Sequence, residues 1–289
     1  MAATIQNTKV HKTERALVTV PDATKRPGRM AEQITIGRDA WGRNCLTRTI
    51  AERRTSNGPM RHEVVKLKSL DTGQLIDMVL HVSRSASTLE ALQLACHAHH
   101  GVMRRDRVLG REHPYIDHPL RNALRAFLWV ADRWPGADVE LVLQGCLLHD
   151  VVEDAPDRVV SFYGGDGSDA AAALGENLGP RLRAAVAAVT NPPELKKLEG
   201  GDKREAYRAH LERSLADDPV ALLVKASDLW DNAGSAFYAD AAFARKMTAK
   251  YLPVIRMISG MAADLGDEVV AGRVSRSMAA LAQKIDVWD

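Results

Sequence analysis

The pattern of hydrophobic and polar residues changes twice along the chain. Residues 1–30 are polar, include Pro21, Pro27 and Gly28, and show neither helical nor strand periodicity, so we expect a poorly ordered arm. Residues 31–86 contain short alternating or β-branched runs, QITIGRD, CLTRTIAE and LIDMVLHV, separated by the turn signals SNGP and DTG. This second segment predicts a small β-rich module.

From residue 87 onward the apolar positions follow a helical period. Ser87 and Glu90 have the spacing of a capping box, and in HPLRNALRAFLWVADRW an apolar stripe follows Pro119, which suits a first helical turn. In DVELVLQGCLLHD, Asp138 is the expected N-cap. Further helices are expected near 178–190, 203–216, 219–233 and 240–263. The fold class is therefore mainly α, with an all-helical domain over 87–265 and a helical C-terminal tail over 266–289.

Composition places the chain among ordinary globular proteins. It has 289 residues, of which 46% are hydrophobic and 26% are charged. No uncharged apolar run approaches the roughly 18 residues of a membrane span, and the N-terminus lacks the apolar region of a secretory signal, so we expect a cytoplasmic protein with no membrane partner. Cys45, Cys96 and Cys146 are widely spaced and odd in number, which indicates reduced thiols and neither a disulfide framework nor a zinc ribbon.

Charge is distributed unevenly. Residues 1–86 carry 15 Lys and Arg against 8 Asp and Glu, whereas the rest of the chain carries 24 against 29. The basic segment contains six arginines that could contact the phosphates of a nucleic acid: Arg38, Arg43, Arg48, Arg53, Arg54 and Arg61. A solvated basic module is the favoured alternative, because few aromatic residues accompany these arginines. Nucleic-acid binding through residues 31–86 stays open.

The stretch LLHDVVED ends an apolar run with one imidazole and three carboxylates. If the helix continues for one more turn, residues four apart share a face, so His149 lies above Glu153 and Asp150 above Asp154. Burying this set without a cation is costly, because like charges a few ångströms apart cannot all stay ionised. A divalent metal would resolve the conflict. The alternative is a solvated helix end followed by an acidic loop.

Two other segments carry polar residues at unusual places. YIDHP places His118 directly before Pro119, at the mouth of a helix, where a capping role is the alternative to metal ligation. In DPVALLVKASDLWDNAGS, Lys225, Asp228 and Asn232 form one polar stripe on an otherwise apolar helix. Such a stripe must face either water or a site.

Three stretches, HPYIDHPL, LLHDVVEDA and LVKASDLWDNA, in this order, resemble the HD hydrolase domain of the RelA/SpoT homologue family and its stand-alone small alarmone hydrolases. The resemblance covers roughly residues 88–262 and implies an all-helical HD-domain metal phosphohydrolase. It implies one Mn²⁺ ion held by His118, His149, Asp150 and Asp228. Mixed imidazole and carboxylate ligands permit manganese, and they also permit cobalt, iron or zinc.

The resemblance also implies a reaction and the residues that carry it. Glu153 and Asp154 match the residues that handle the attacking water and its protons. The substrate-binding residues would be Arg104, Arg105, Lys225 and Asn232. His99 aligns with a family histidine near the pocket, and a structural role for it is equally open. The implied reaction removes pyrophosphate from the 3′ position of a guanosine or adenosine alarmone, leaving GDP, GTP or the adenosine equivalent.

The chain departs from the family pattern at Leu229 and Gly234, where the family carries positive charges, so two charges are missing from a helix expected to face a polyphosphate. Another HD phosphohydrolase activity, on a dNTP or on NADPH, is therefore an alternative. About 25 residues follow the last helices, too few for a synthetase domain, so a family member of this kind would only degrade. Such stand-alone hydrolases include antitoxins, whose functional partner is a small alarmone synthetase.

Overall fold

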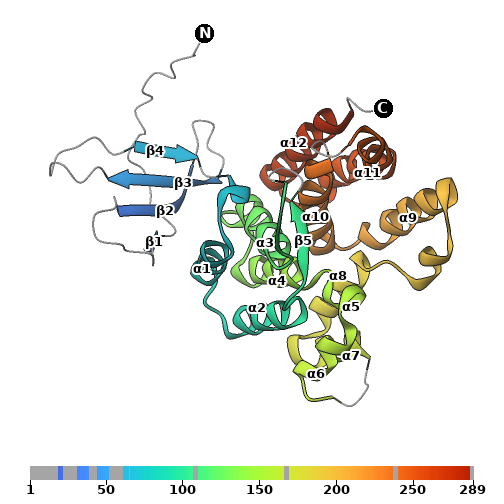
Figure 1. Ribbon diagram of the computed structural model, residues 1–289, viewed down its shortest axis with the longest axis horizontal. Coiled ribbons are helices and arrows are strands. Elements are labelled where there is room, and N and C mark those ends of the chain that lie inside the picture. Colours follow the sequence, from blue (N-terminus) through green and yellow to red (C-terminus); the bar gives the residue numbers. More distant parts are fainter. Residues whose placement is uncertain are drawn as a thin grey trace, which may run out of the picture. The chain divides into compact units, whose positions relative to one another are not determined.

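The computed structural model describes the backbone of residues 19–21, 31–38, 44–51, 61–64, 66–106, 110–165, 169–236 and 240–286. The chain forms two compact units, Met1–Leu70 and Asp71–Asp289, which are treated separately below (Figure 1).

The first unit contains an antiparallel sheet in the order β1-β2-β3-β4. Its elements are β1 (Thr19–Pro21), β2 (Ala31–Arg38), β3 (Asn44–Ala51), β4 (Arg61–Val64) and the short 3-10 helix η1 (Leu67–Ser69). The prediction of strands is confirmed here. β1 lies inside the segment expected to be a poorly ordered arm, and it pairs with β2 outside that segment. The prediction is therefore wrong for the three residues of β1. The rest of residues 1–30, and the side chains of the six arginines, lie outside what the structure describes.

The segment LIDMVLHV is helical, and its prediction as a strand is wrong. It belongs to α1 (Thr72–Val82), whose N-cap Asp71 makes a reciprocal capping box with Gln74. DTG is therefore a helix start and not a turn between strands. The helix buries one stripe at helical spacing: Leu75, Met78 and Val79. The boundary between the units consequently falls after Leu70, and not near residue 86.

Two predicted caps also differ from the structure. α2 (Ala86–Ala98) is capped by Ser85, which accepts from the backbone N–H of Thr88, because the backbone turns two residues before Ser87. α4 (Gly136–Leu148) starts after Pro135, so Asp138 lies inside the first turn. There its carboxylate still interacts favourably with the helix dipole, and it accepts a hydrogen bond from Arg181.

Helices α3, α4 and α10 pack against one another at the centre of the second unit (Figure 1). α1 packs on α3, α2 packs on α4, and α11 and α12 cover α10. The bounds are α3 (Asp117–Val130), α5 (Val151–Asp154), α6 (Pro156–Phe162), α7 (Ala170–Leu178), α8 (Pro180–Val189), η2 (Pro193–Lys197), α9 (Gly200–Leu215), α10 (Pro219–Ala236), α11 (Ala241–Met261), η3 (Ala262–Asp264) and α12 (Glu268–Ile285), with the hairpin β5 (Met103–Asp106) and β6 (Arg111–Pro114). The four further helices expected after residue 178 are confirmed.

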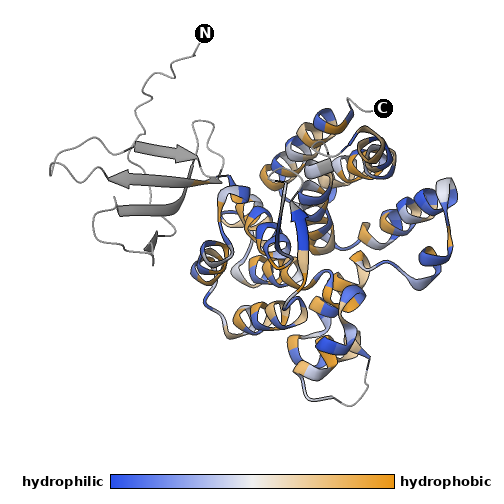
Figure 2. Cartoon of the chain, in the orientation of Figure 1, coloured by the Kyte–Doolittle hydropathy of each residue, from blue (hydrophilic) through white to orange (hydrophobic). Residues whose placement is uncertain are grey.

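The central helices are apolar along much of their length, whereas α9 is mostly hydrophilic (Figure 2). α12 was expected as a tail, and its helical conformation is confirmed. It packs on both α10 and α11, so it belongs to the same core, and the expected boundary at residue 265 has no counterpart. The apolar stripe that α12 buries consists of Val270, Val274, Met278, Leu281 and Ile285. Among the described residues, no helix combines the length and the apolar character needed to cross a bilayer.

Candidate metal centre

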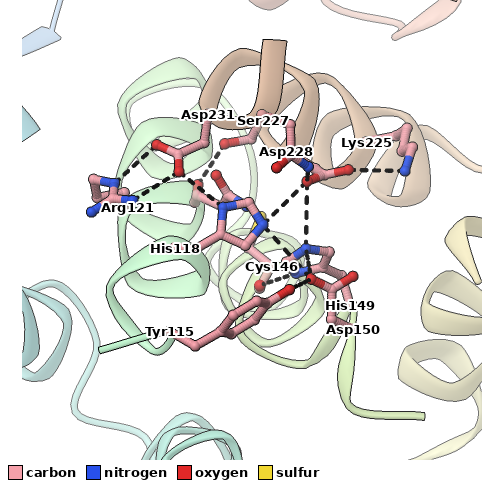
Figure 3. Close-up of polar contacts among 12 residues, drawn as sticks. Tyr115, His118, Arg121, Cys146, His149, Asp150, Lys225, Ser227, Asp228 and Asp231 are labelled. Atoms are coloured by element: carbon pink, nitrogen blue, oxygen red, sulfur yellow. Dashed lines mark hydrogen bonds and ion pairs between the residues drawn. The ribbon is translucent and has the colours of Figure 1, made fainter. Parts of the chain in front are cut away.

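Three central helices bring together two histidines and two aspartates from distant parts of the chain (Figure 3). His118 lies in the first turn of α3, His149 is the C-cap of α4, and Asp228 lies in the middle of α10. All three are almost fully buried, and each offers a ligand atom within 4.8 Å of the others. Asp150, the N-cap of α5, is partly exposed beside them.

The two imidazoles face the two carboxylates through their Nε2 atoms. His118 Nε2 lies 3.2 Å from Asp228 Oδ1 and 3.7 Å from Asp150 Oδ2. His149 Nε2 lies 3.0 Å from Asp150 Oδ2 and 3.6 Å from Asp228 Oδ1. Four ligand atoms of the types that bind divalent transition metals therefore converge on one small space.

Each histidine makes its shortest hydrogen bond through Nδ1, and His118 Nε2 also lies 3.4 Å from Asn122 Nδ2. His149 Nδ1 lies 2.8 Å from the carbonyl oxygen of Cys146, which can only accept, so Nδ1 carries the proton. Within the described part of the chain, the buried His149 Nε2 has no geometrically defined hydrogen-bond partner, although Asp150 Oδ2 lies 3.0 Å away. Imidazole nitrogens and carboxylate oxygens gathered this closely in a buried place could hold a divalent cation.

Electrostatics at the centre also call for a positive charge. Burial opposes the charged imidazolium, but the carboxylates of Asp150 and Asp228 outweigh burial and raise the pKa of His149 to about 10. Burial would raise the pKa of Asp228, yet Lys225 and the two histidines hold it well below its usual range. The two carboxylates therefore favour a positive charge beside them, which either a proton on His149 or a bound metal ion would supply.

Two of the expected substrate-binding residues contact the metal centre itself. Lys225 Nζ donates to Asp228 Oδ2 at 2.9 Å and is buried, and Asn232 Nδ2 donates to Asp228 Oδ1. The Arg104 guanidinium donates to the side-chain oxygen Oδ1 of Asn232 and lies 5.7 Å from the centroid of the Tyr115 ring. Lys225 therefore orients Asp228, and Arg104 and Asn232 lie at the less buried edge of the cluster.

Arg105 and Glu153, expected to bind substrate and to act on the attacking water, make no hydrogen bond or ion pair with the ligand atoms of the cluster among the described residues. Arg105 is exposed on β5, opposite Glu112 in the hairpin. Glu153 accepts from the backbone N–H of Asn191 at 3.1 Å and from its side-chain amide at 2.9 Å. The expected stacking of His149 over Glu153 does not form, because α4 ends at Leu148 and a new helix starts at Val151.

Asp150 and Asp154 do meet, through a residue that the sequence analysis left without a role. Tyr115 Oη donates to Asp150 Oδ2 at 2.6 Å and approaches Asp154 Oδ2 at 3.3 Å. Burial and the neighbouring carboxylates of Asp150 and Glu153 raise the pKa of Asp154. His99 packs against the Tyr115 ring, with centroids 4.6 Å apart, and burial lowers the pKa of His99 to about 4. This tyrosine stands in the motif YIDHP, and its place next to a candidate metal-binding histidine was the only signal in the sequence for its role.

Residues 229 and 234, where the family pattern has positive charges, lie in the packing of α10 against its neighbours. Leu229 is fully buried in the core. A side chain at Gly234 would meet Leu281 of α12, and the carbonyl oxygen of Gly234 accepts from Lys284. Both positions lie on the faces of α10 that pack against other helices. A positive charge at either position would enter this helix packing, so the lack of one there removes nothing from the candidate metal centre.

Comparison of the chain with models of protein families gives no match, and comparison with curated proteins gives none either.

Proposed function

We propose that the protein is a metal-dependent phosphohydrolase of the HD type, which hydrolyses the 3′-pyrophosphate of an alarmone related to ppGpp. The observation that carries the proposal is the buried convergence of His118 Nε2, His149 Nε2 and Asp228 Oδ1, with Asp150 beside them. The substrate class comes from the resemblance of the three motifs. Manganese is the proposed ion, because the donor set suits it and the resemblance implies it.

The chemistry divides between the ion and the residues beside it. A divalent ion bound by these ligands supplies a Lewis acid for hydrolytic attack on phosphorus. Glu153, held by two hydrogen bonds from Asn191, takes a proton from the attacking water. Asp154, whose pKa is raised, is the second proposed proton-transfer group. Tyr115 keeps Asp150 and Asp154 together.

Arg104 and Asn232 are the proposed contacts for the phosphates at the rim, and Arg105 approaches the substrate from solvent. Arginine is suited to this role because its planar group can donate two hydrogen bonds to one phosphate.

The test is a substrate screen. The purified protein, with Mn²⁺ added, is incubated with ppGpp, pppGpp, the adenosine alarmone, a set of dNTPs and NADPH, and released pyrophosphate and phosphate are measured separately. Release of pyrophosphate from an alarmone, abolished by a chelator, supports the proposal. Turnover of none of these nucleotides would overturn it.

A second candidate is an HD phosphohydrolase that acts on a dNTP or on the 2′-phosphate of NADPH. It is favoured by the position of Lys225, because this buried cation is paired with Asp228 and leaves fewer charges for a substrate with pyrophosphates at both ends. The same screen distinguishes the two, since NADPH would release phosphate and an alarmone would release pyrophosphate.

A cytoplasmic location, a functional pairing with a small alarmone synthetase, and nucleic-acid binding through residues 31–86 stay proposals. Binding to phosphate backbones through that segment would weaken steeply with salt and would be lost when residues 1–86 are deleted.

A further inference from the structure

We infer that Asp231 is a positioning residue that fixes the tautomer and the orientation of His118, and that Arg121 and Arg125 hold Asp231 in place. This role of Asp231 rests on the proposed metal centre. It extends that proposal, since none of the sequence motifs assigned a role to Asp231. Asp231 follows Asp228 by three residues on α10, so the two carboxylates share a face of that helix. One is directed at the ion site and the other at the back of His118 (Figure 3).

Both oxygens of Asp231 are engaged by donors. Oδ2 accepts from His118 Nδ1 at 2.9 Å and from Arg121 Nη2 at 2.9 Å. Oδ1 accepts from Arg121 Nε at 2.9 Å, and Arg125 Nη2 lies 3.5 Å from it. The Asp231 side chain is 1% exposed and that of His118 is fully buried, so water does not compete for these contacts.

The arginines keep Asp231 charged and immobile. Arg121 donates to both carboxylate oxygens through Nε and Nη2, and Arg125 lies beside Oδ1, so two guanidinium groups balance the charge of Asp231. Arg125 is fixed in turn, because its guanidinium donates to Asn122 Oδ1 and to the carbonyl oxygen of Ser227. The network therefore spans α3 and α10, the two helices that carry His118 and Asp228.

An ionised carboxylate can only accept, so the proton of His118 is on Nδ1 and the lone pair is on Nε2. Nε2 faces Asp228 and Asp150 and lies 3.4 Å from Asn122 Nδ2, a donor that agrees with this tautomer. The contact also fixes the plane of the ring and raises the basicity of Nε2. His149 obtains its tautomer from a backbone carbonyl, which no substitution removes. His118 depends on a side chain, and this makes the role testable.

The competing explanation is that the Asp231–Arg121 pair only joins two helices. A matched pair in the same unit tests this. Asp132, just after α3, accepts from both terminal nitrogens of Arg273 on α12 at 2.6 and 3.0 Å, and both side chains are largely buried. This pair also joins two helices through a bidentate contact, and neither of its members is a proposed metal ligand.

The experiment compares Asp231→Asn with Asp132→Asn. Asparagine keeps the shape but has one acceptor oxygen, so in either amide orientation its NH₂ group meets a donor from Arg121 or His118. Mn²⁺ dissociation constants are measured by calorimetry, and melting temperatures and circular dichroism are measured on the metal-free proteins. We expect Asp231→Asn to weaken Mn²⁺ binding by about 10- to 100-fold, the range for partners of ligating histidines. Asp132→Asn lowers the melting temperature and leaves the dissociation constant unchanged.

A second measurement needs no variant. In the wild-type protein loaded with Zn²⁺, nuclear magnetic resonance should show a slowly exchanging proton on His118 Nδ1, because that proton is buried between two side chains. Its absence overturns the role of Asp231, even if Asp231→Asn does not fold. Wild-type affinity in a folded Asp231→Asn variant also overturns it and leaves the proposed function standing. A wild-type protein that binds no divalent ion overturns both.

Discussion

Tyr115 Oη donates a 2.6 Å hydrogen bond to Asp150 Oδ2, and through it the segment before α3 is joined to the end of α4. The same hydroxyl lies 3.3 Å from Asp154, so one neutral donor lies between two carboxylates. This contact sets Asp150 at the edge of the buried cluster, where it faces both histidines.

Tyr115→Phe tests this arrangement. The variant keeps the ring that packs on His99 but loses the donor to Asp150. A hydrogen bond to a charged group contributes about 1.5–3 kcal/mol, so kcat/KM should fall by roughly 10- to 100-fold. Tyr251→Phe on α11 is the control, because its hydroxyl contacts Lys250. Equal kinetics of the two variants would contradict a role for the Tyr115 hydroxyl.

Glu153→Gln separates metal binding from proton transfer. The amide keeps an acceptor for Asn191 but cannot take up a proton. We expect Mn²⁺ affinity to stay at the wild-type level while kcat falls by about 10²- to 10⁴-fold, the usual contribution of an acid–base group. Exposed Glu176→Gln is the control. A loss of less than about tenfold would show that another group is the main base.

Arg105→Ala tests the approach of the substrate. Arg105 is exposed on β5, next to the residue that contacts Asn232. We expect KM for the alarmone to rise far more than kcat falls, which is the pattern for an interaction made equally in the ground state and the transition state. Exposed Lys203→Ala on α9 controls for the loss of a surface charge. An unchanged KM would remove Arg105 from the substrate-binding residues.

Asp267 gives a prediction about stability and pH. It caps α12 and accepts from the backbone N–H groups of Val269 and Val270. The bond from Val270 is the main reason that the pKa of Asp267 is lowered from 3.8. Because the folded-state pKa is depressed, its stabilisation is present above pH 3.8 and is lost as pH falls through the folded-state value.

Asp267→Ala should therefore lower the free energy of unfolding by about 1 kcal/mol at neutral pH, the usual value of a helix cap. The difference from the wild type should narrow as the pH falls below the unfolded-state pKa. Denaturant unfolding at several pH values measures this. A difference that does not depend on pH would contradict the charged cap.

The sequence predicted the helices of the second unit because their apolar stripes repeat at helical spacing over several turns. It failed at α1, where a short apolar run fits strand and helix equally and the capping box of Asp71 decides between them. The four residues of the candidate metal centre are predictable because each stands in a compact local motif. The roles of Asn191 and Asp231 are not predictable from the sequence. Asn191 contacts Glu153 and Asp231 contacts His118, and in both cases only the packing of the fold brings together residues that are far apart in the chain.

Leu229 illustrates a limit of motif reasoning. It adjoins Asp228, yet consecutive helical residues lie about 100° apart, so its side chain enters the core. The position in the motif did not determine the face of the helix.

The central claim is that His149 and its neighbours hold a divalent ion, and equilibrium Mn²⁺ binding tests it most directly. The measurement compares the wild-type protein with His149→Ala and Asp150→Ala, and circular dichroism monitors the helices. We predict one bound ion per chain for the wild type, and loss of both the ion and nucleotide hydrolysis in the variants, with helical content retained because both residues lie at a helix end. Wild-type binding by both variants, or nucleotide hydrolysis by the wild type in a strong chelator, would contradict the claim.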